Sequence, residues 1–199
     1  MRIMKVKRAI ILLLAIGVMT LVSGCVRYPD GHNGNGETNY QLEITVEVYG
    51  EINTADEGIY YIVLDADENP ETGPGSDILP WEVSYYYIKL EDGLFYFAKP
   101  EGGFEYYTGE ILDGDDDGNK ESFQVTIALS DLGKPESVDI NVITTDTESS
   151  ITYDHLATYF TVYTENIGFQ NPDPDSLGDS GDGGVDFDIV KITAEIISP

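Results

Sequence analysis

The stretch Gln41-Leu42-Glu43-Ile44-Thr45-Val46-Glu47-Val48 places an apolar residue at every second position. Successive side chains of a β-strand point to opposite sides, so this period of two predicts a strand with one buried and one solvated face. The stretch SFQVTIAL at residues 122–129 repeats the pattern, and so do Val138, Ile140 and Val142. Strands of this kind build sheets that pack one face against a core.

Further apolar and β-branched runs, separated by Gly, Asp or Pro, predict more strands at residues 59–64, 81–90, 94–98, 104–111 and 156–163. The sequence Glu91-Asp92-Gly93 predicts a tight hairpin turn. The alternation in residues 188–197 adds a last strand, which would pair with an open sheet edge. Since no long segment has a helical stripe, we expect an all-β fold: an antiparallel two-sheet β-sandwich, jelly-roll-like, with about eight or nine strands.

The N-terminus joins a charged region to an apolar one. Four cations, Arg2, Lys5, Lys7 and Arg8, precede a 14-residue apolar segment at residues 9–22. A transmembrane helix needs about 20 residues, so we interpret the segment as a targeting signal. The sequence Leu21-Val22-Ser23-Gly24-Cys25 resembles a lipobox, which implies lipidation of Cys25 and a membrane-anchored protein outside the cytoplasm. An ordinary secretory signal is the alternative.

The chain is strongly acidic, with 37 Asp and Glu against 10 Lys and Arg and a formal net charge of −27. Such a surface repels phosphate, so nucleic acid is excluded as a partner and contact with a membrane is restricted to the lipid anchor. Divalent cations are natural partners. Because lipidation would consume Cys25, the only cysteine, stability depends on a core, on metal or on both.

Composition divides the chain into five segments. They are a lipoprotein signal peptide at 1–24, a flexible tether at 25–39, a β-sandwich domain at 40–164, an acidic Gly/Pro/Asp-rich loop or linker at 165–184 and a C-terminal strand at 185–199. A domain of about 125 residues is long enough to bury a core of its own.

A first acidic loop, DADENPETG at residues 65–73, follows a predicted strand. Asp65, Asp67 and Asn69 place side-chain oxygens two residues apart in a turn, where they can converge on one point. Two carboxylates about 4 Å apart repel by about 1 kcal/mol in water, and a bound calcium ion removes that cost. The alternative is that Asp, Asn, Pro and Gly simply build a turn.

A second acidic loop, DGDDDGN at residues 113–119, matches the opening of a calcium loop, D-x-D-x-D-G. The predicted ligands are Asp113, Asp115, Asp117 and Asn119. The match is incomplete, because Gln124 stands where a bidentate Glu is expected and strands flank the loop. A solvated hairpin loop is the alternative.

Three segments in order resemble the β-sandwich domains of exported proteins that are grouped as carbohydrate-binding module family 9-like or DOMON-like. They are GIYYIVLDADENPETGPGSDIL at 58–79, YYYIKLEDGLFYF at 85–97 and ESFQVTIALSDLG at 121–133. The resemblance implies a sandwich over residues 40–164. It also implies calcium held by Asp65, Asp67 and Asp77, with Asn69 adding an oxygen, and a role in binding either sugar or haem.

The sequence favours sugar over haem. Haem iron usually takes His or Met ligands, but Met1, Met4 and Met19 lie in the signal segment and His155 is the only histidine between residues 40 and 164, so we expect no haem.

Trp81, Tyr85 and Tyr87 share one face of their predicted strand and form a candidate platform for a sugar ring, whereas Tyr86, Ile88 and Leu90 would face the core. Sugar-binding members of the resembled family clamp the ligand between two tryptophans, and this chain has one. The alternative is that these rings cover the edges of the core.

Catalysis is not expected, because the chain has no nucleophile elbow, H-E-x-x-H motif or phosphate loop. Two carboxylates suffice for a glycosidase, but among 37 acids such a pair is uninformative. The sequence therefore favours a non-catalytic, calcium-stabilised lipoprotein that binds a poly- or oligosaccharide at the cell surface. The alternative is a structural or accessory protein of the cell envelope that contacts other exported proteins and has no sugar ligand.

Overall fold

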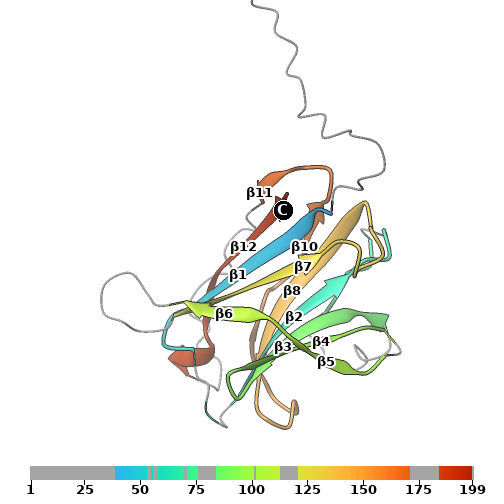
Figure 1. Ribbon diagram of the computed structural model, residues 1–199. Helices are drawn as coiled ribbons and strands as arrows, with labels where there is room; N and C mark the ends of the chain where they lie inside the picture. Colours follow the sequence, from blue (N-terminus) through green and yellow to red (C-terminus); the bar gives the residue numbers. More distant parts are fainter. Residues whose placement is uncertain are drawn as a thin grey trace, which may run out of the picture. The chain divides into compact units, whose positions relative to one another are not determined.

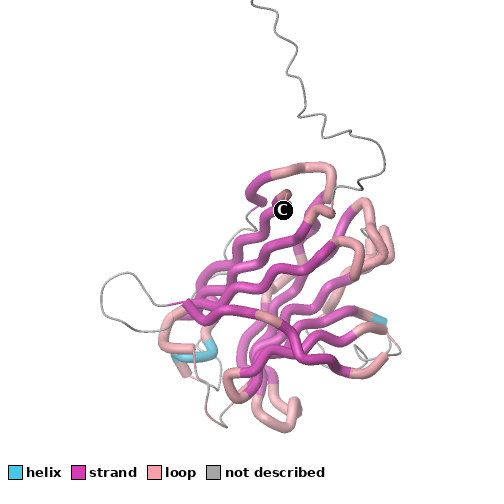
Figure 2. The backbone as a smooth tube through the Cα atoms, viewed as in Figure 1, coloured by secondary structure: helices cyan, strands magenta, loops and turns pink. Residues whose placement is uncertain are grey.

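A computed structural model of the chain describes residues 39–52, 55, 58–69, 71–75, 84–100, 102–112, 121–170 and 184–198. These residues form two antiparallel sheets packed against each other, so the predicted all-β sandwich is confirmed (Figures 1 and 2). The compact unit that contains both sheets spans Asn39–Pro199.

The five-stranded sheet has the order β11-β12-β1-β7-β6. Its strands are β11 (Gly168–Gln170), β12 (Ile189–Ile197), β1 (Gln41–Val48), β7 (Ser122–Ala128) and β6 (Gly109–Leu112). A short 3-10 helix, Val185–Phe187, leads into β12.

The seven-stranded sheet has the order β10-β8-β2-β3-β4-β5, and β9 also pairs with β8. Its strands are β10 (Phe160–Tyr163), β8 (Ser137–Thr145), β2 (Ile59–Asp65), β3 (Tyr86–Glu91), β4 (Leu94–Ala98), β5 (Phe104–Tyr107) and β9 (Thr152–His155).

The period of two in the sequence sets the main core. In β1 and β7 the apolar residues are buried and lie directly opposite one another, as in the pairs Leu42 with Ile127 and Ile44 with Val125. They pack against the inner face of the seven-stranded sheet, which supplies Tyr60, Ile62, Leu64, Ile88, Leu90, Val138, Ile140 and Val142. The burial of every second side chain is confirmed.

The central strands β2 and β8 are buried on both faces. On the face away from the main core, called here the outer face, lies a second apolar cluster made of Ile59, Tyr61, Val63, Tyr87, Ala98 and Ile143. The loop after β2 is tied to this face, because Asn141 Nδ2 donates a hydrogen bond of 2.9 Å to the Pro74 carbonyl. Gly73 of the same loop lies so close to Tyr159 that an added Cβ would meet its ring at 2.4 Å.

The hairpin between β3 and β4 is confirmed. Glu91 pairs with Leu94, and the two residues between them, Asp92 and Gly93, have φ of 53° and 71°. Two successive positive φ values are typical of a type I′ turn, whose twist matches that of antiparallel strands.

Residues 104–111, predicted as one strand, divide between the two sheets. β5 pairs with β4, whereas β6 pairs with β7. The first residue after the crossover, Gly109, leaves room for Phe95, since a Cβ there would lie 2.6 Å from its ring. A glycine at this bend therefore lets the chain change sheets beside a buried aromatic ring.

Strand boundaries also differ near the C-terminus. Residues 156–163 were predicted as one strand, but β9 ends at His155 and β10 begins at Phe160. The last strand, β12, does pair with β1 along its length, and β11 covers its other side. β11 falls within the range 165–184 that composition predicts as loop or linker.

Gly109→Ala should lower the free energy of unfolding by about 1–3 kcal/mol, because the new methyl group overlaps the buried Phe95 ring. Gly103→Ala is the matched control, since a Cβ there meets nothing within 4 Å. Urea unfolding measures both variants. Equal midpoints would show that the crossover tolerates a side chain at Gly109.

Candidate functional site

Five of the residues predicted for a site lie in the described part of the chain, and all five are on β2, β3 or the segments next to them. They are Asp65, Asp67, Asn69, Tyr85 and Tyr87. The others lie outside the described residues: Cys25, Asp77, Trp81, Asp113, Asp115, Asp117 and Asn119.

The acidic loop after β2 is a series of turns capped by its own side chains. Asp65 Oδ1 accepts the Asp67 N–H at 3.0 Å, and Asp67 Oδ1 accepts the Asn69 N–H at 2.8 Å. Asn69 Oδ1 then accepts the Glu71 N–H at 3.3 Å. These bonds build the turn that the composition predicts, and they use one oxygen of each side chain.

Register places a second carboxylate beside Asp65. Asp139 of β8 is directly opposite Asp65 of β2, and the two residues are only 4% and 5% exposed. The pKa of Asp65 is raised to about 6: burial is the main cause, the hydrogen bond from the Asp67 N–H lowers it, and the negative charges of Asp67 and Asp139 raise it. Burial also raises the pKa of Asp139. Thr161 Oγ1 donates a 2.5 Å hydrogen bond to Asp139 Oδ1, which lowers this pKa and partly offsets the effect of burial.

Asn141 lies two residues along β8, on the same face as Asp139. It is 1% exposed, and its Oδ1 has no hydrogen-bond partner among the described residues. Asp65, Asp139 and Asn141 together are called here the oxygen cluster. Sequence reasoning found Asp65 and missed the two residues from β8. Only the register of β2 with β8 sets Asp139 opposite Asp65 and Asn141 opposite Val63, so that Asn141 is a diagonal neighbour of Asp65 on the same face.

The described residues contain no group of three or more His, Cys, Asp or Glu side chains arranged to hold a metal ion. Any cation in the oxygen cluster would therefore have mixed donors, two carboxylates and one amide, completed by main-chain oxygen or water.

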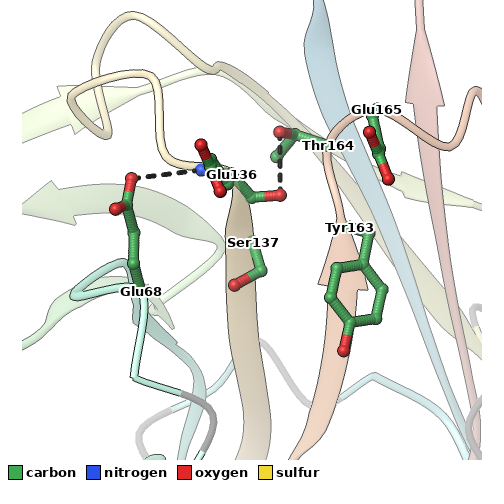
Figure 3. Close-up of a pocket in the computed structure, with 6 residues that line it drawn as sticks. All are labelled: Glu68, Glu136, Ser137, Tyr163, Thr164 and Glu165. Atoms are coloured by element: carbon green, nitrogen blue, oxygen red, sulfur yellow. Dashed lines mark hydrogen bonds between the residues drawn. The ribbon is translucent and has the colours of Figure 1, made fainter.

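A pocket of about 440 Å³ lies where β8 begins and β10 ends, at Ser137 and Tyr163 (Figure 3). Its lining comprises Glu68, Glu136, Ser137, Tyr163, Thr164 and Glu165. Glu68 Oε1 accepts the Glu136 N–H at 3.3 Å, and Thr164 Oγ1 donates to the Glu136 carbonyl at 3.1 Å. The pocket is acidic, and its described lining contains no histidine, cysteine or lysine that could complete a nucleophile–base pair.

The predicted platform residues have different surroundings. Tyr85 and Tyr87 are on the outer face, while Tyr86, Ile88 and Leu90 belong to the main core, as predicted. Tyr85 is half-buried, and burial raises its pKa together with the charges of Asp65 and Asp67.

The expectation that Tyr87 presents an open ring requires correction, because Tyr87 is 5% exposed. Its ring contacts those of Tyr61 and Phe104, with centroids 5.9 and 5.7 Å away. The second apolar cluster on the outer face thus buries a tyrosine that strand alternation alone places on the surface.

Farther along the same face, β5 presents two exposed rings and β4 one partly buried ring. Tyr96, Phe104 and Tyr106 form what is called here the aromatic surface; Phe104 is 54% and Tyr106 78% exposed. The rings of Tyr96 and Tyr106 have centroids 5.3 Å apart and are tilted by 34°. The alternation of residues 94–98 and 104–107 is the sequence signal that could have placed these three rings on one face.

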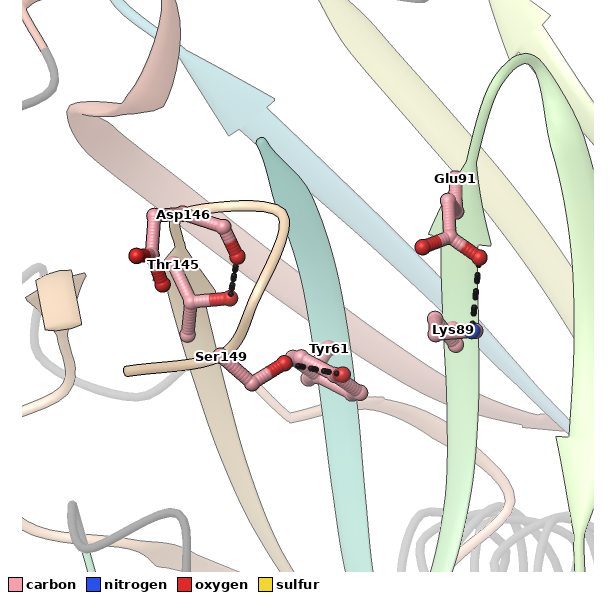
Figure 4. A network of polar contacts seen from close by, with 6 residues as sticks. All are labelled: Tyr61, Lys89, Glu91, Thr145, Asp146 and Ser149. Carbon is pink, nitrogen blue, oxygen red and sulfur yellow. Dashed lines mark hydrogen bonds and ion pairs between the residues drawn. The ribbon is translucent and has the colours of Figure 1, made fainter. Parts of the chain in front are cut away.

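A lysine from β3 lies against the aromatic surface. Lys89 Nζ is 5.2 Å from the centroid of Tyr96 and 5.1 Å from that of Phe104, which is within the range of cation–π attraction. Lys89 Nζ also binds Glu91 Oε2 at 2.7 Å (Figure 4). On the adjacent strand, the Tyr61 hydroxyl shares a 2.8 Å hydrogen bond with Ser149 Oγ (Figure 4). Polar groups therefore border the exposed rings.

Comparison with family models, with curated proteins and with solved structures found no match. In the part of the chain that the structure describes, no helix is long and apolar enough to cross a membrane.

With divalent cations removed by EDTA, the free energy of unfolding should fall by roughly 2–3 kcal/mol as Asp65 ionises between about pH 4 and pH 6. The native state holds the Asp65 proton more tightly than the unfolded chain, where the pKa is 3.8, so this stability is present at low pH and is lost as pH rises. Asp139 acts in the same direction. Urea unfolding at several pH values measures the slope.

Asp65→Asn should flatten that slope. Glu110→Gln is the control, because it removes one exposed carboxylate from β6 of the other sheet and so accounts for general charge repulsion. Parallel pH profiles for the wild type and Asp65→Asn would contradict the assignment.

Proposed function

We propose that the chain is a non-catalytic lipoprotein, anchored through Cys25 outside the cytoplasm, whose calcium-stabilised β-sandwich binds carbohydrate. The observation that supports sugar binding best is the aromatic surface of Tyr96, Phe104 and Tyr106, which combines exposed rings with bordering charged groups.

The chemistry of these residues matches that of a sugar. The C–H face of a pyranose ring is apolar and stacks on an aromatic ring, while its hydroxyls need hydrogen-bond donors and acceptors at the edge. Tyr96 and Tyr106 provide neighbouring rings, and Lys89 and Glu91 provide a donor and an acceptor on the next strand. In the proposed contact the aromatic surface takes the place of Tyr87, which is buried. Of the other predicted platform residues, Tyr85 is half-buried on the same face and Trp81 lies outside the described residues.

The charge of the chain narrows the ligand class. A formal net charge of −27 repels sulfated and uronic acid polymers, so the favoured ligands are neutral or amine-bearing poly- or oligosaccharides. An exposed, open sheet face also suits a chain better than a single sugar, because several successive units can contact it.

A structural or accessory envelope protein is the second candidate. β5 is a sheet-edge strand with three exposed residues and one partly exposed residue, and such an edge can also receive another exported protein. The two candidates differ in whether the aromatic surface binds isolated glycans.

A glycan array should show binding to neutral glycans, and Tyr106→Ala should weaken the best of them by about tenfold or more in calorimetric titration, since a stacking ring is lost. Tyr49→Ala is the matched control, because Tyr49 is a 70% exposed tyrosine that follows β1 in the other sheet.

An array without hits from folded protein would favour the structural candidate. Equal losses in Tyr106→Ala and Tyr49→Ala would place the sugar elsewhere on the molecule.

A further inference from the structure

The oxygen cluster buries two carboxylates, those of Asp65 and Asp139. Among the described residues, no ion pair involves Asp65 or Asp139. Within the described residues, the hydrogen bonds to these carboxylates come from neutral donors, the Asp67 N–H and the Thr161 hydroxyl. Two buried and opposed negative charges are unfavourable unless a bound proton or a cation compensates them.

Asn141 gives a second and independent indication. Its Oδ1 is a buried acceptor without a hydrogen-bond partner in the described structure, which is uncommon in folded proteins. The amide orientation is fixed chemically, because Nδ2 donates to the Pro74 carbonyl at 2.9 Å. Exchanging the nitrogen and oxygen would set two acceptors against each other. The unpartnered atom is therefore an oxygen, on the same side of β8 as the Asp139 carboxylate.

We propose that Asp65, Asp139 and Asn141 bind a calcium ion on the outer face of the seven-stranded sheet. Calcium accepts carboxylate, amide, main-chain and water oxygens in an irregular shell of six to eight, at about 2.4 Å. Magnesium demands near-octahedral geometry, and zinc prefers nitrogen and sulfur donors, so neither suits this set as well.

This ligand set differs from those that the sequence predicts. Asp65 is shared with the set of Asp67, Asn69 and Asp77, whereas Asp139 and Asn141 come from β8 and from none of the acidic loops. The inference deepens the calcium part of the proposed function and is independent of sugar binding.

The ion would join three parts of the structure. Asp65 ends β2, Asp139 and Asn141 belong to β8, and Asn141 also holds the loop after β2 through Pro74. Calcium would therefore fix this loop across the outer face in addition to neutralising the two carboxylates.

Thermal unfolding of the purified protein in EDTA and in about 5 mM CaCl2 tests the proposal. We expect calcium to raise the Tm of the wild type by about 5 °C or more. Asp139→Asn should have a Tm in EDTA at least equal to that of the wild type, because a buried charge is removed, and should lose most of the calcium shift. Glu110→Gln, the control on β6, should keep the full shift.

For Asn141→Asp we expect the opposite change in both the Tm in EDTA and the calcium shift. The variant adds a third carboxylate to the cluster, so its Tm in EDTA should fall and its calcium shift should grow. This variant keeps the proposal testable if Asp139→Asn does not unfold cooperatively.

No calcium shift in the wild type would overturn the proposal. A shift that is equal in the wild type, Asp139→Asn and Asn141→Asp would also overturn it and would assign the ion to other acidic residues, such as those at 113–119. Glycan binding is measured separately, so its loss with an intact calcium pattern would reject only the sugar ligand.

Discussion

The burial of β2 and β8 on both faces is the constraint on which the rest of the structure depends. Their inner side chains join the two sheets. Their outer apolar side chains form most of the second apolar cluster, and the loop after β2 is tied to the same face. A polar residue on the outer face of these strands is therefore removed from water and needs a partner there. Among the described residues, the Thr161 hydroxyl donates to Asp139 and the Pro74 carbonyl accepts from Asn141 Nδ2, whereas Asn141 Oδ1 has no hydrogen-bond partner. This unpartnered oxygen beside buried carboxylates makes the oxygen cluster the chemically distinctive region of the sandwich.

The same constraint bears on how so acidic a chain folds despite the electrostatic repulsion between its carboxylates. Carboxylates that face water are screened by salt over about 10 Å and repel one another weakly. Asp65 and Asp139 are buried, so salt screens them less, and the same burial raises the pKa of each. The electrostatic cost is thus concentrated in a few buried groups, and a single divalent ion can offset it.

The sequence predicted features that depend on local pattern. Alternation in residues 41–48 and 122–129 specified which side chains enter the core, and Asp92-Gly93 specified its turn. The placement of Asp139 opposite Asp65, with Asn141 two residues farther along the same face of β8, could not be predicted, because strand register between distant segments is not a local property. The burial of Tyr87 was missed for the same reason, because it depends on contacts with Tyr61 and Phe104 from other strands.

The outer face divides into a polar half around β8 and an aromatic half around β4 and β5, and the division bears on how a ligand would bind. The rings of Tyr96 and Tyr106 pack against each other, and Lys89 contacts the rings of Tyr96 and Phe104. Phe104 is in turn held by Tyr87, which is buried. Rings that are already fixed lose little conformational freedom on binding, so more of the stacking energy remains as affinity. Under the proposed function, packing among the aromatic strands, rather than a flexible loop, would therefore determine which ligand shapes this surface accepts.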